Sequence, residues 1–182
     1  MSDARAVAAM FDAAEARLGG VDVLVNNAGL LKLSPIAAAD DAMFDQSVAV
    51  NLKGTFNGLR EAARRFRTGG RIVSVSSSVV GLYQPTYGIY AATKAAIKAL
   101  THILAKELGG RGITVNAIAP GPTTTELFLK DKTPELIERI ERMNPIGRLG
   151  TVDDIAKVVS FLVGPDGGWV NGQVLRANGG VV

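Results

Sequence analysis

Apolar positions along the chain switch repeatedly between the spacing of a helix and that of a buried strand. The first segment opens with Ser2 and Asp3, which favour helix starts, and closes before Gly19, which favours a helix end. Between them apolar residues recur every three or four positions, as on one face of a helix: Val7, Met10, Phe11, Ala14 and Leu18. The apolar run VDVLVN at 21–26 then predicts a strand buried on both faces.

The rest of the chain repeats this alternation. Helical periodicity predicts helices over about 40–66, from about Tyr90 to Leu108, over 134–143 and over 152–164. Thr151 and Asp154 resemble a capping box at the start of the last helix. Strand-like runs lie at 71–77, 113–119 and 173–178. This alternation indicates an α/β fold, in which helices cover both faces of a parallel sheet and right-handed crossovers join its strands.

Composition and charge narrow the classes of function. The chain has 182 residues, of which 47% are hydrophobic, so it is long enough for one substantial core. Its 20 basic and 17 acidic residues give a net charge of +3 without a block of like charge, and we expect no nucleic-acid partner. It has no cysteine, and its single His102 has no candidate co-ligands, so we expect no metal. Without a membrane-spanning apolar run or a signal peptide, the sequence predicts a cytoplasmic protein with no membrane partner.

Polar and glycine-rich stretches follow three of the predicted strands. They are NNAG at 26–29, SSSVVG at 76–81 and APGPTTT at 119–125. The carboxyl ends of parallel strands meet at one edge of a sheet, and ligands of such folds bind there. The sequence therefore predicts a ligand site at this edge.

Tyr90 and Lys94 have the residue types of a proton donor and of the cation that tunes its pKa. They lie four residues apart in a predicted helix, which puts both side chains on one face. A tyrosine beside a solvated lysine is also common on ordinary helix surfaces. The spacing alone leaves both interpretations open.

Taken together, NNAG, NLKG (51–54), SSSVVG, YAATK (90–94) and APGPTTT, in this order, resemble the short-chain dehydrogenase/reductase family over essentially the whole chain. Within it, the chain is most similar to 3-oxoacyl-acyl-carrier-protein reductase-like members. The resemblance implies a Rossmann-like, doubly wound parallel sheet, with 1–182 as a single partial domain. It also implies an oxidoreductase that moves a hydride between NAD or NADP and a carbonyl or alcohol substrate, which is a small molecule or an acyl thioester.

The resemblance assigns roles to individual residues. Tyr90 matches the family's general acid/base, and Lys94 matches the residue that lowers the pKa of this tyrosine and holds the nicotinamide ribose, since a nearby ammonium stabilises a phenolate. Asn51 matches an asparagine that holds a water in the proton relay. The remaining cofactor contacts implied by the resemblance fall on Asn26, Ala28, Gly29, Pro120, Gly121 and Thr125.

The catalytic serine has two candidates. Its usual separation from Tyr90 in the family selects Ser77, whereas the family pattern SxxG, anchored on Gly81, selects Ser78. The two counts differ because the loop between Gly81 and Tyr90 is one residue shorter than the family's common form. Ser78 is preferred, because a surface loop absorbs such a deletion more easily than the end of a strand does.

The sequence departs from the family at one point. The glycine-rich turn that holds the cofactor pyrophosphate is not found, and neither is the residue that selects NAD or NADP. We therefore expect only the family's last four strands, with an open apolar edge at VDVLVN. The preferred hypothesis is an incomplete record of a longer reductase, in which Met1 replaces an internal valine, so that this chain is weakly active or inactive. The alternatives are a non-catalytic relative that serves protein association and a truncated enzyme rescued by a partner.

The resemblance also implies self-association. Family members usually form dimers or tetramers through their two long helices, which correspond here to about 41–66 and 87–108. Alanines at 91, 92, 95, 96 and 99 would allow helices to approach closely. We expect a homo-oligomer.

Overall fold

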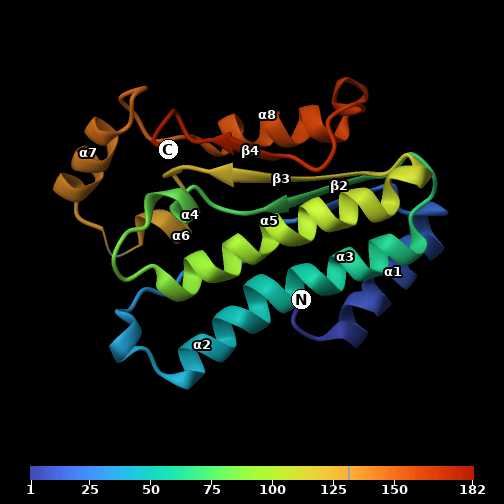
Figure 1. The fold of residues 1–182 in the computed structure, drawn as a ribbon, viewed down its shortest axis with the longest axis horizontal. Coiled ribbons are helices and arrows are strands. Elements are labelled where there is room, and N and C mark those ends of the chain that lie inside the picture. The colour runs from blue at the N-terminus through green and yellow to red at the C-terminus, as the bar shows by residue number, and fades with distance from the viewer. Residues whose placement is uncertain (131) are drawn as a thin grey trace.

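A parallel four-stranded sheet forms the centre of the computed structural model, which describes residues 1–130 and 132–182 (Figure 1). Its strands follow one another across the sheet in chain order: β1 (Val23–Asn26), β2 (Arg71–Val75), β3 (Thr114–Pro120) and β4 (Val174–Ala177). Each neighbouring pair is parallel. This confirms the predicted α/β, Rossmann-like class and all four predicted strands.

Eight α-helices connect and flank these strands in the described part of the chain. They are α1 (Ala4–Leu18), α2 (Asp41–Ser47), α3 (Gly54–Arg65), α4 (Val79–Leu82), α5 (Gly88–Leu108), α6 (Glu126–Leu129), α7 (Pro134–Met143) and α8 (Val152–Val163). Shorter turns of other helix types are η1 (Ile36–Ala38), η2 (Val48–Lys53), η3 (Gly109–Arg111) and η4 (Pro165–Gly167). The sequence predicted α1, α5, α7 and α8 but not α4 or α6. Among these described helices, none combines the length and the apolar character needed to cross a membrane.

Capping residues set the ends of several helices. The Asp3 carboxylate accepts hydrogen bonds from the backbone N–H groups of Arg5 (2.8 Å) and Ala6 (3.3 Å), and Gly19 ends α1 with φ of 75°. The predicted capping box of Thr151 and Asp154 is present at the start of α8. The predicted helix over 40–66 is continuous but contains the π-helical stretch η2.

Two apolar layers cover the two faces of the sheet. On one face, Phe11 of α1, Leu59 of α3 and Leu108 of α5 pack with Ile72 of β2 in one core cluster. On the other face, Leu162 of α8 packs with strand residues that include Val73 and Ile118. Neighbouring residues of β2 thus point to opposite faces, as the strand period of two requires.

The strands advance across the sheet in one direction, but their connecting helices change face. The β1–β2 connection through α3 and the β2–β3 connection through α5 use one face, while the β3–β4 connection through α8 uses the other (Figure 1). The third crossover therefore has the opposite hand, and the prediction of right-handed crossovers is wrong for α8. Val23 and Val25 of the edge strand β1 are 45% and 41% exposed, whereas Leu24 and Asn26 are buried. The edge is open as predicted, but β1 is buried on one face only, so the prediction of burial on both faces is wrong.

Candidate active site

A cavity of about 800 Å³ lies at the carboxyl ends of the strands. Its walls come from the loops after β1, β2 and β3, from the first turns of α5, and from α6, α7 and α8. The strand ends that the sequence singled out therefore do converge on one site.

Lys94 joins helix α5 to the end of β2. Its side chain is buried, with 4% exposure, and its ammonium donates a hydrogen bond to the carbonyl oxygen of Val75 at 2.8 Å. The Ser76 hydroxyl donates to the backbone carbonyl of Lys94 at 2.9 Å, so β2 and α5 are joined twice. Burial lowers the pKa of Lys94 to about 8. At neutral pH the lysine still carries its charge.

Tyr90 lies one helical turn before Lys94, as predicted. The Lys94 Nζ atom is 5.8 Å from the centroid of the Tyr90 ring and donates to β2. Burial raises the pKa of Tyr90, a hydrogen bond with the Ser77 side chain opposes this rise, and neighbouring Tyr87 adds to it. The expected lowering of the tyrosine pKa by Lys94 is thus not found. A raised pKa keeps the phenol protonated at neutral pH, which suits a proton donor.

The three serines after β2 have three different partners. Ser76 bonds to the backbone of Lys94, as described above. The Ser78 hydroxyl donates to the Ala119 carbonyl at 2.9 Å and accepts from the Asn178 amide at 2.9 Å, deep in the protein. Ser77 is the serine that bonds with Tyr90. All three serines line the cavity. Ser78 stays the prediction from motif spacing, and the interaction of Ser77 with Tyr90 supports the alternative candidate.

Asn51 lies inside η2 and braces the loop after β1. Its Oδ1 atom accepts a hydrogen bond from the Leu30 N–H at 2.8 Å, and its Nδ2 atom donates to the Leu30 carbonyl at 3.0 Å and to the Thr93 hydroxyl at 3.2 Å. The side chain is fully buried and does not line the cavity. Widened helical turns of this kind often occur at functional sites. Here the turn holds the loop that carries Gly29.

Gly29 keeps a recess beside the Lys94 ammonium. A Cβ atom at this position would lie 3.5 Å from Lys94 Nζ and 3.3 Å from Asn51 Oδ1. Only a residue without a side chain leaves this space open. Of the other predicted cofactor residues, Pro120, Gly121 and Thr125 also line the cavity.

Asn26 and Ala28 lie apart from the cavity lining. The Asn26 amide is buried, donates to the Ser74 hydroxyl at 3.2 Å, and packs against Gly58 of α3. Ala28 is exposed. Asn27, which is not among the predicted cofactor residues, lines the cavity instead. Nothing in NNAG distinguishes the two asparagines, because their directions depend on where the strand ends.

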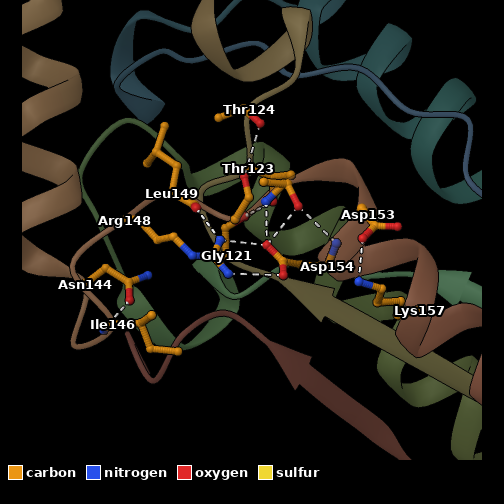
Figure 2. Close-up of polar contacts among 12 residues, drawn as sticks. Gly121, Thr123, Thr124, Asn144, Ile146, Arg148, Leu149, Asp153, Asp154 and Lys157 are labelled. Carbon is orange, nitrogen blue, oxygen red and sulfur yellow. Dashed lines mark hydrogen bonds and ion pairs between the residues drawn. The ribbon is translucent and has the colours of Figure 1, made fainter.

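Helices α6 and α7, which we name the lid, cover the cavity with Phe128 and Ile140 among other side chains. The two ends of the lid are joined at its base. Gly150 donates to the Pro122 carbonyl and accepts from the Thr124 N–H, each at 2.9 Å. Figure 2 shows this region and the adjacent pair of Arg148 and Asp154, which form hydrogen bonds of 2.7 and 3.1 Å.

Comparison with known proteins identifies the family. A family model described as Enoyl-(Acyl carrier protein) reductase matches residues 1–182. An NADPH-dependent aldehyde reductase-like protein, chloroplastic, from Arabidopsis thaliana is 46% identical over 187 residues, which cover 100% of this chain and 69% of the relative. A short-chain type dehydrogenase/reductase from Picea abies is 46% identical over 97% of this chain and 66% of its own length. The chain belongs to the short-chain dehydrogenase/reductase family.

Solved structures of short-chain dehydrogenases/reductases agree with this assignment. The enzyme from Serratia marcescens is 34% identical with a TM-score of 0.93, covering 99% of this chain and 73% of its own. A short-chain dehydrogenase from Burkholderia cenocepacia, solved in complex with NADP, is 35% identical with a TM-score of 0.92 and the same coverage. The chain spans about two thirds of the length of the two curated relatives above.

The buried lysine predicts a specific dependence of stability on pH. Because the pKa of Lys94 falls from 10.5 to about 8 on folding, the unfolded chain binds more protons between these values, and the lysine destabilises the fold less as pH rises. Between pH ~7 and ~9.5, the free energy of unfolding of the natural chain should therefore increase relative to Lys94→Met by about 2 kcal/mol, at about 1.4 kcal/mol per pKa unit.

Urea unfolding at each pH measures this difference. Lys106→Met, at an exposed position of the same helix, is the control for loss of a lysine. A Lys94→Met difference that stayed constant across this range would show that the ammonium is not buried as described.

Proposed function

We propose that this site reduces a carbonyl group with a nicotinamide cofactor, using Tyr90 as the proton donor and Ser77 as its partner. The observation that carries the proposal is the arrangement of Tyr90, which bonds with Ser77 and lies over the buried Lys94 at the edge of an apolar cavity. The relative from Arabidopsis is named as NADPH-dependent, and the Burkholderia structure contains NADP. These names favour NADP over NAD for this chain.

The residues present suit the nicotinamide and ribose end of such a cofactor. Lys94 has three N–H donors, and Val75 is the one hydrogen-bond acceptor that its ammonium has among the described residues. Gly29 keeps space beside this ammonium, where ribose hydroxyls would bind. Pro120, Gly121 and Thr125 would hold the nicotinamide. When bound, the reduced nicotinamide supplies the hydride.

The side chains supply the rest of the chemistry. As the substrate oxygen gains negative charge, Tyr90 transfers its phenolic proton to it, and the Ser77 hydroxyl donates a hydrogen bond to the same oxygen. Asn51 acts by position, because it holds the Leu30 backbone and with it the loop of Gly29.

The cavity walls favour a neutral, apolar substrate. Leu30, Leu82, Leu127, Phe128 and Ile140 contribute to the lining, and Lys94 is the only charged side chain among the described lining residues. We therefore propose an apolar aldehyde or ketone as the substrate class. A 3-oxoacyl thioester stays a candidate because its acyl chain has the same character. The cytoplasmic location also stays a prediction, since the Arabidopsis relative is designated chloroplastic.

Substitution of Tyr90 tests the proposed reaction. Tyr90→Phe keeps the ring but removes the proton, so NADPH-dependent reduction of a long-chain aldehyde should fall by about 10²-fold or more, with little change in NADPH affinity. Residues 1–182 alone contain no glycine-rich pyrophosphate turn, so we expect slow turnover from them. The alcohol product is therefore measured by mass spectrometry, and the affinity by nicotinamide fluorescence.

Tyr87→Phe is the matched control, since Tyr87 also lines the cavity and contacts the Tyr90 ring with centroids 6.5 Å apart. It should keep most of the turnover. Equal losses in the two variants, or normal turnover by Tyr90→Phe, would refute the proposed role of Tyr90.

We also propose that the chain associates with copies of itself through α3, α5 and η2. Apolar side chains line a shallow hollow between these elements, among them Leu52, Phe56, Leu100 and Ile103. Phe56 is 44% exposed and Ile103 is 57% exposed. Exposed apolar surface of this kind marks association sites. The same surface would serve the alternative function, a non-catalytic association module.

Ile103→Glu should break this association, because it places a charge among the apolar side chains that line the hollow. Sedimentation equilibrium should then give a monomer, whereas the natural chain should sediment as a dimer or larger species. Leu18→Glu, on α1 at 76% exposure, is the control and should sediment like the natural chain. A natural chain that is monomeric at micromolar concentration would contradict the proposal.

A further inference from the structure

A buried asparagine near the C-terminus contacts both the lid and residues 76–78, which we name the serine loop. Asn178 directly follows β4 and is 8% exposed. Its Nδ2 atom donates to the Ser78 hydroxyl at 2.9 Å and to the Val182 carbonyl at 3.2 Å, and its Oδ1 atom accepts from the Gly180 N–H at 3.0 Å. Both amide protons and the oxygen are used, so the orientation of this side chain is fixed.

The bond to Asn178 determines how Ser78 can bond. A hydroxyl has one proton, and Ser78 uses it to donate to the Ala119 carbonyl at 2.9 Å. Its oxygen must then accept, and Asn178 supplies the donor. The backbone N–H of Ser78 also donates to Pro120 at 3.0 Å. Ser77 precedes this anchored residue, so its approach to Tyr90 depends on the anchor.

The C-terminal end of the lid is hydrogen-bonded to the same asparagine. Asn144 follows α7 as its C-cap, is 6% exposed, and donates from Nδ2 to the backbone carbonyl of Asn178 at 3.0 Å. Its Oδ1 atom accepts from the Ile146 N–H at 2.9 Å (Figure 2). Ile140, one turn earlier in α7, lines the cavity.

Two glycines allow these close approaches. A Cβ atom at Gly121 would lie 2.9 Å from the Cα atom of Asn178, and one at Gly179 would lie 2.3 Å from Asn144 Oδ1. Gly179 also has φ of 67°, which favours glycine. The serine loop, the end of β4 and the end of the lid are thus packed into contact without intervening side chains.

On the basis of the function proposed above, we propose that Asn178 is a positioning residue that holds Ser77 beside Tyr90 through Ser78 and fixes the end of the lid through its backbone carbonyl. Seating of the lid and alignment of the serine and tyrosine are then linked. Asn178 itself does not touch the reacting atoms.

Titration of the Tyr90 phenol tests this link without any need for turnover. Ser77 and Tyr87 both influence the pKa of Tyr90, the Lys94 ammonium lies 5.8 Å from the centroid of its ring, and the Thr93 hydroxyl donates to its backbone carbonyl. In a background of Tyr83→Phe and Tyr87→Phe, Tyr90 is the only tyrosine left, and its ultraviolet absorbance reports the phenolate. Loss of the Ser77 bond should move this titration to higher pH.

Asn178→Ala should shift the Tyr90 titration in the same direction as Ser77→Ala. Ser78→Ala removes the other half of the same bond and should do likewise, which provides a second variant if Asn178→Ala does not fold. Asn116→Ala is the matched control: this fully buried asparagine of β3 bonds to Val170 (2.7 Å) and Gln173 (2.9 Å) and should leave the titration unchanged.

The lid is tested with Asn144→Ala. Trypsin should cut this variant several-fold faster at the exposed Arg139 and Arg142 of α7, and its Tyr90 titration should also move to higher pH. Faster cleavage with an unchanged titration would refute the link between lid and serine.

The outcomes separate this inference from the function on which it rests. If Ser77→Ala leaves the Tyr90 titration unchanged, the pairing of Ser77 with Tyr90 fails, and the proposed mechanism fails with it. If Ser77→Ala shifts the titration while folded Asn178→Ala and Ser78→Ala do not, the positioning role alone is refuted.

Discussion

The hydrogen bond from the Lys94 ammonium to the Val75 carbonyl joins the first turns of α5 to the end of β2. Burying a lysine is costly unless its charge finds partners, and the lowered pKa of Lys94 reflects this cost. Neighbouring features accommodate the buried group: Ser76 bonds to the same helix, Gly29 leaves space, and Asn51 holds the loop of that glycine. The position of Tyr90 over the cavity follows from this arrangement.

Much of the fold could be predicted because its determinants are local. Asp3 and Thr151 cap their helices through residues two or three positions away, so short sequence patterns are enough. The strands are short apolar runs between helices, which identified the parallel sheet. Tyr90 and Lys94 could be placed on one face because the helical period is fixed.

Other features depend on contacts that no short pattern records. Ser77 and Ser78 differ in their partners, because Ser77 interacts with Tyr90 and Ser78 bonds to Asn178, which lies 100 positions from it in the sequence. Asn51 in the π-helical stretch bonds to Leu30 and Thr93, which lie far from it in the sequence. The reversed hand of the α8 crossover depends on which face of the sheet receives Leu162. Each follows from tertiary packing.

If the proposed function is right, the cavity beside Lys94 receives the nicotinamide end of the cofactor. Reduced nicotinamide mononucleotide carries that end without the adenosine. Titrated into the ¹⁵N-labelled chain, it should shift the amide resonances of Gly29, Ser77 and Tyr90, while adenosine monophosphate at the same concentration leaves them in place and Lys94→Met loses the response. Resonance shifts confined to other parts of the chain, or equal shifts with adenosine monophosphate, would show that this cavity does not bind the nicotinamide end.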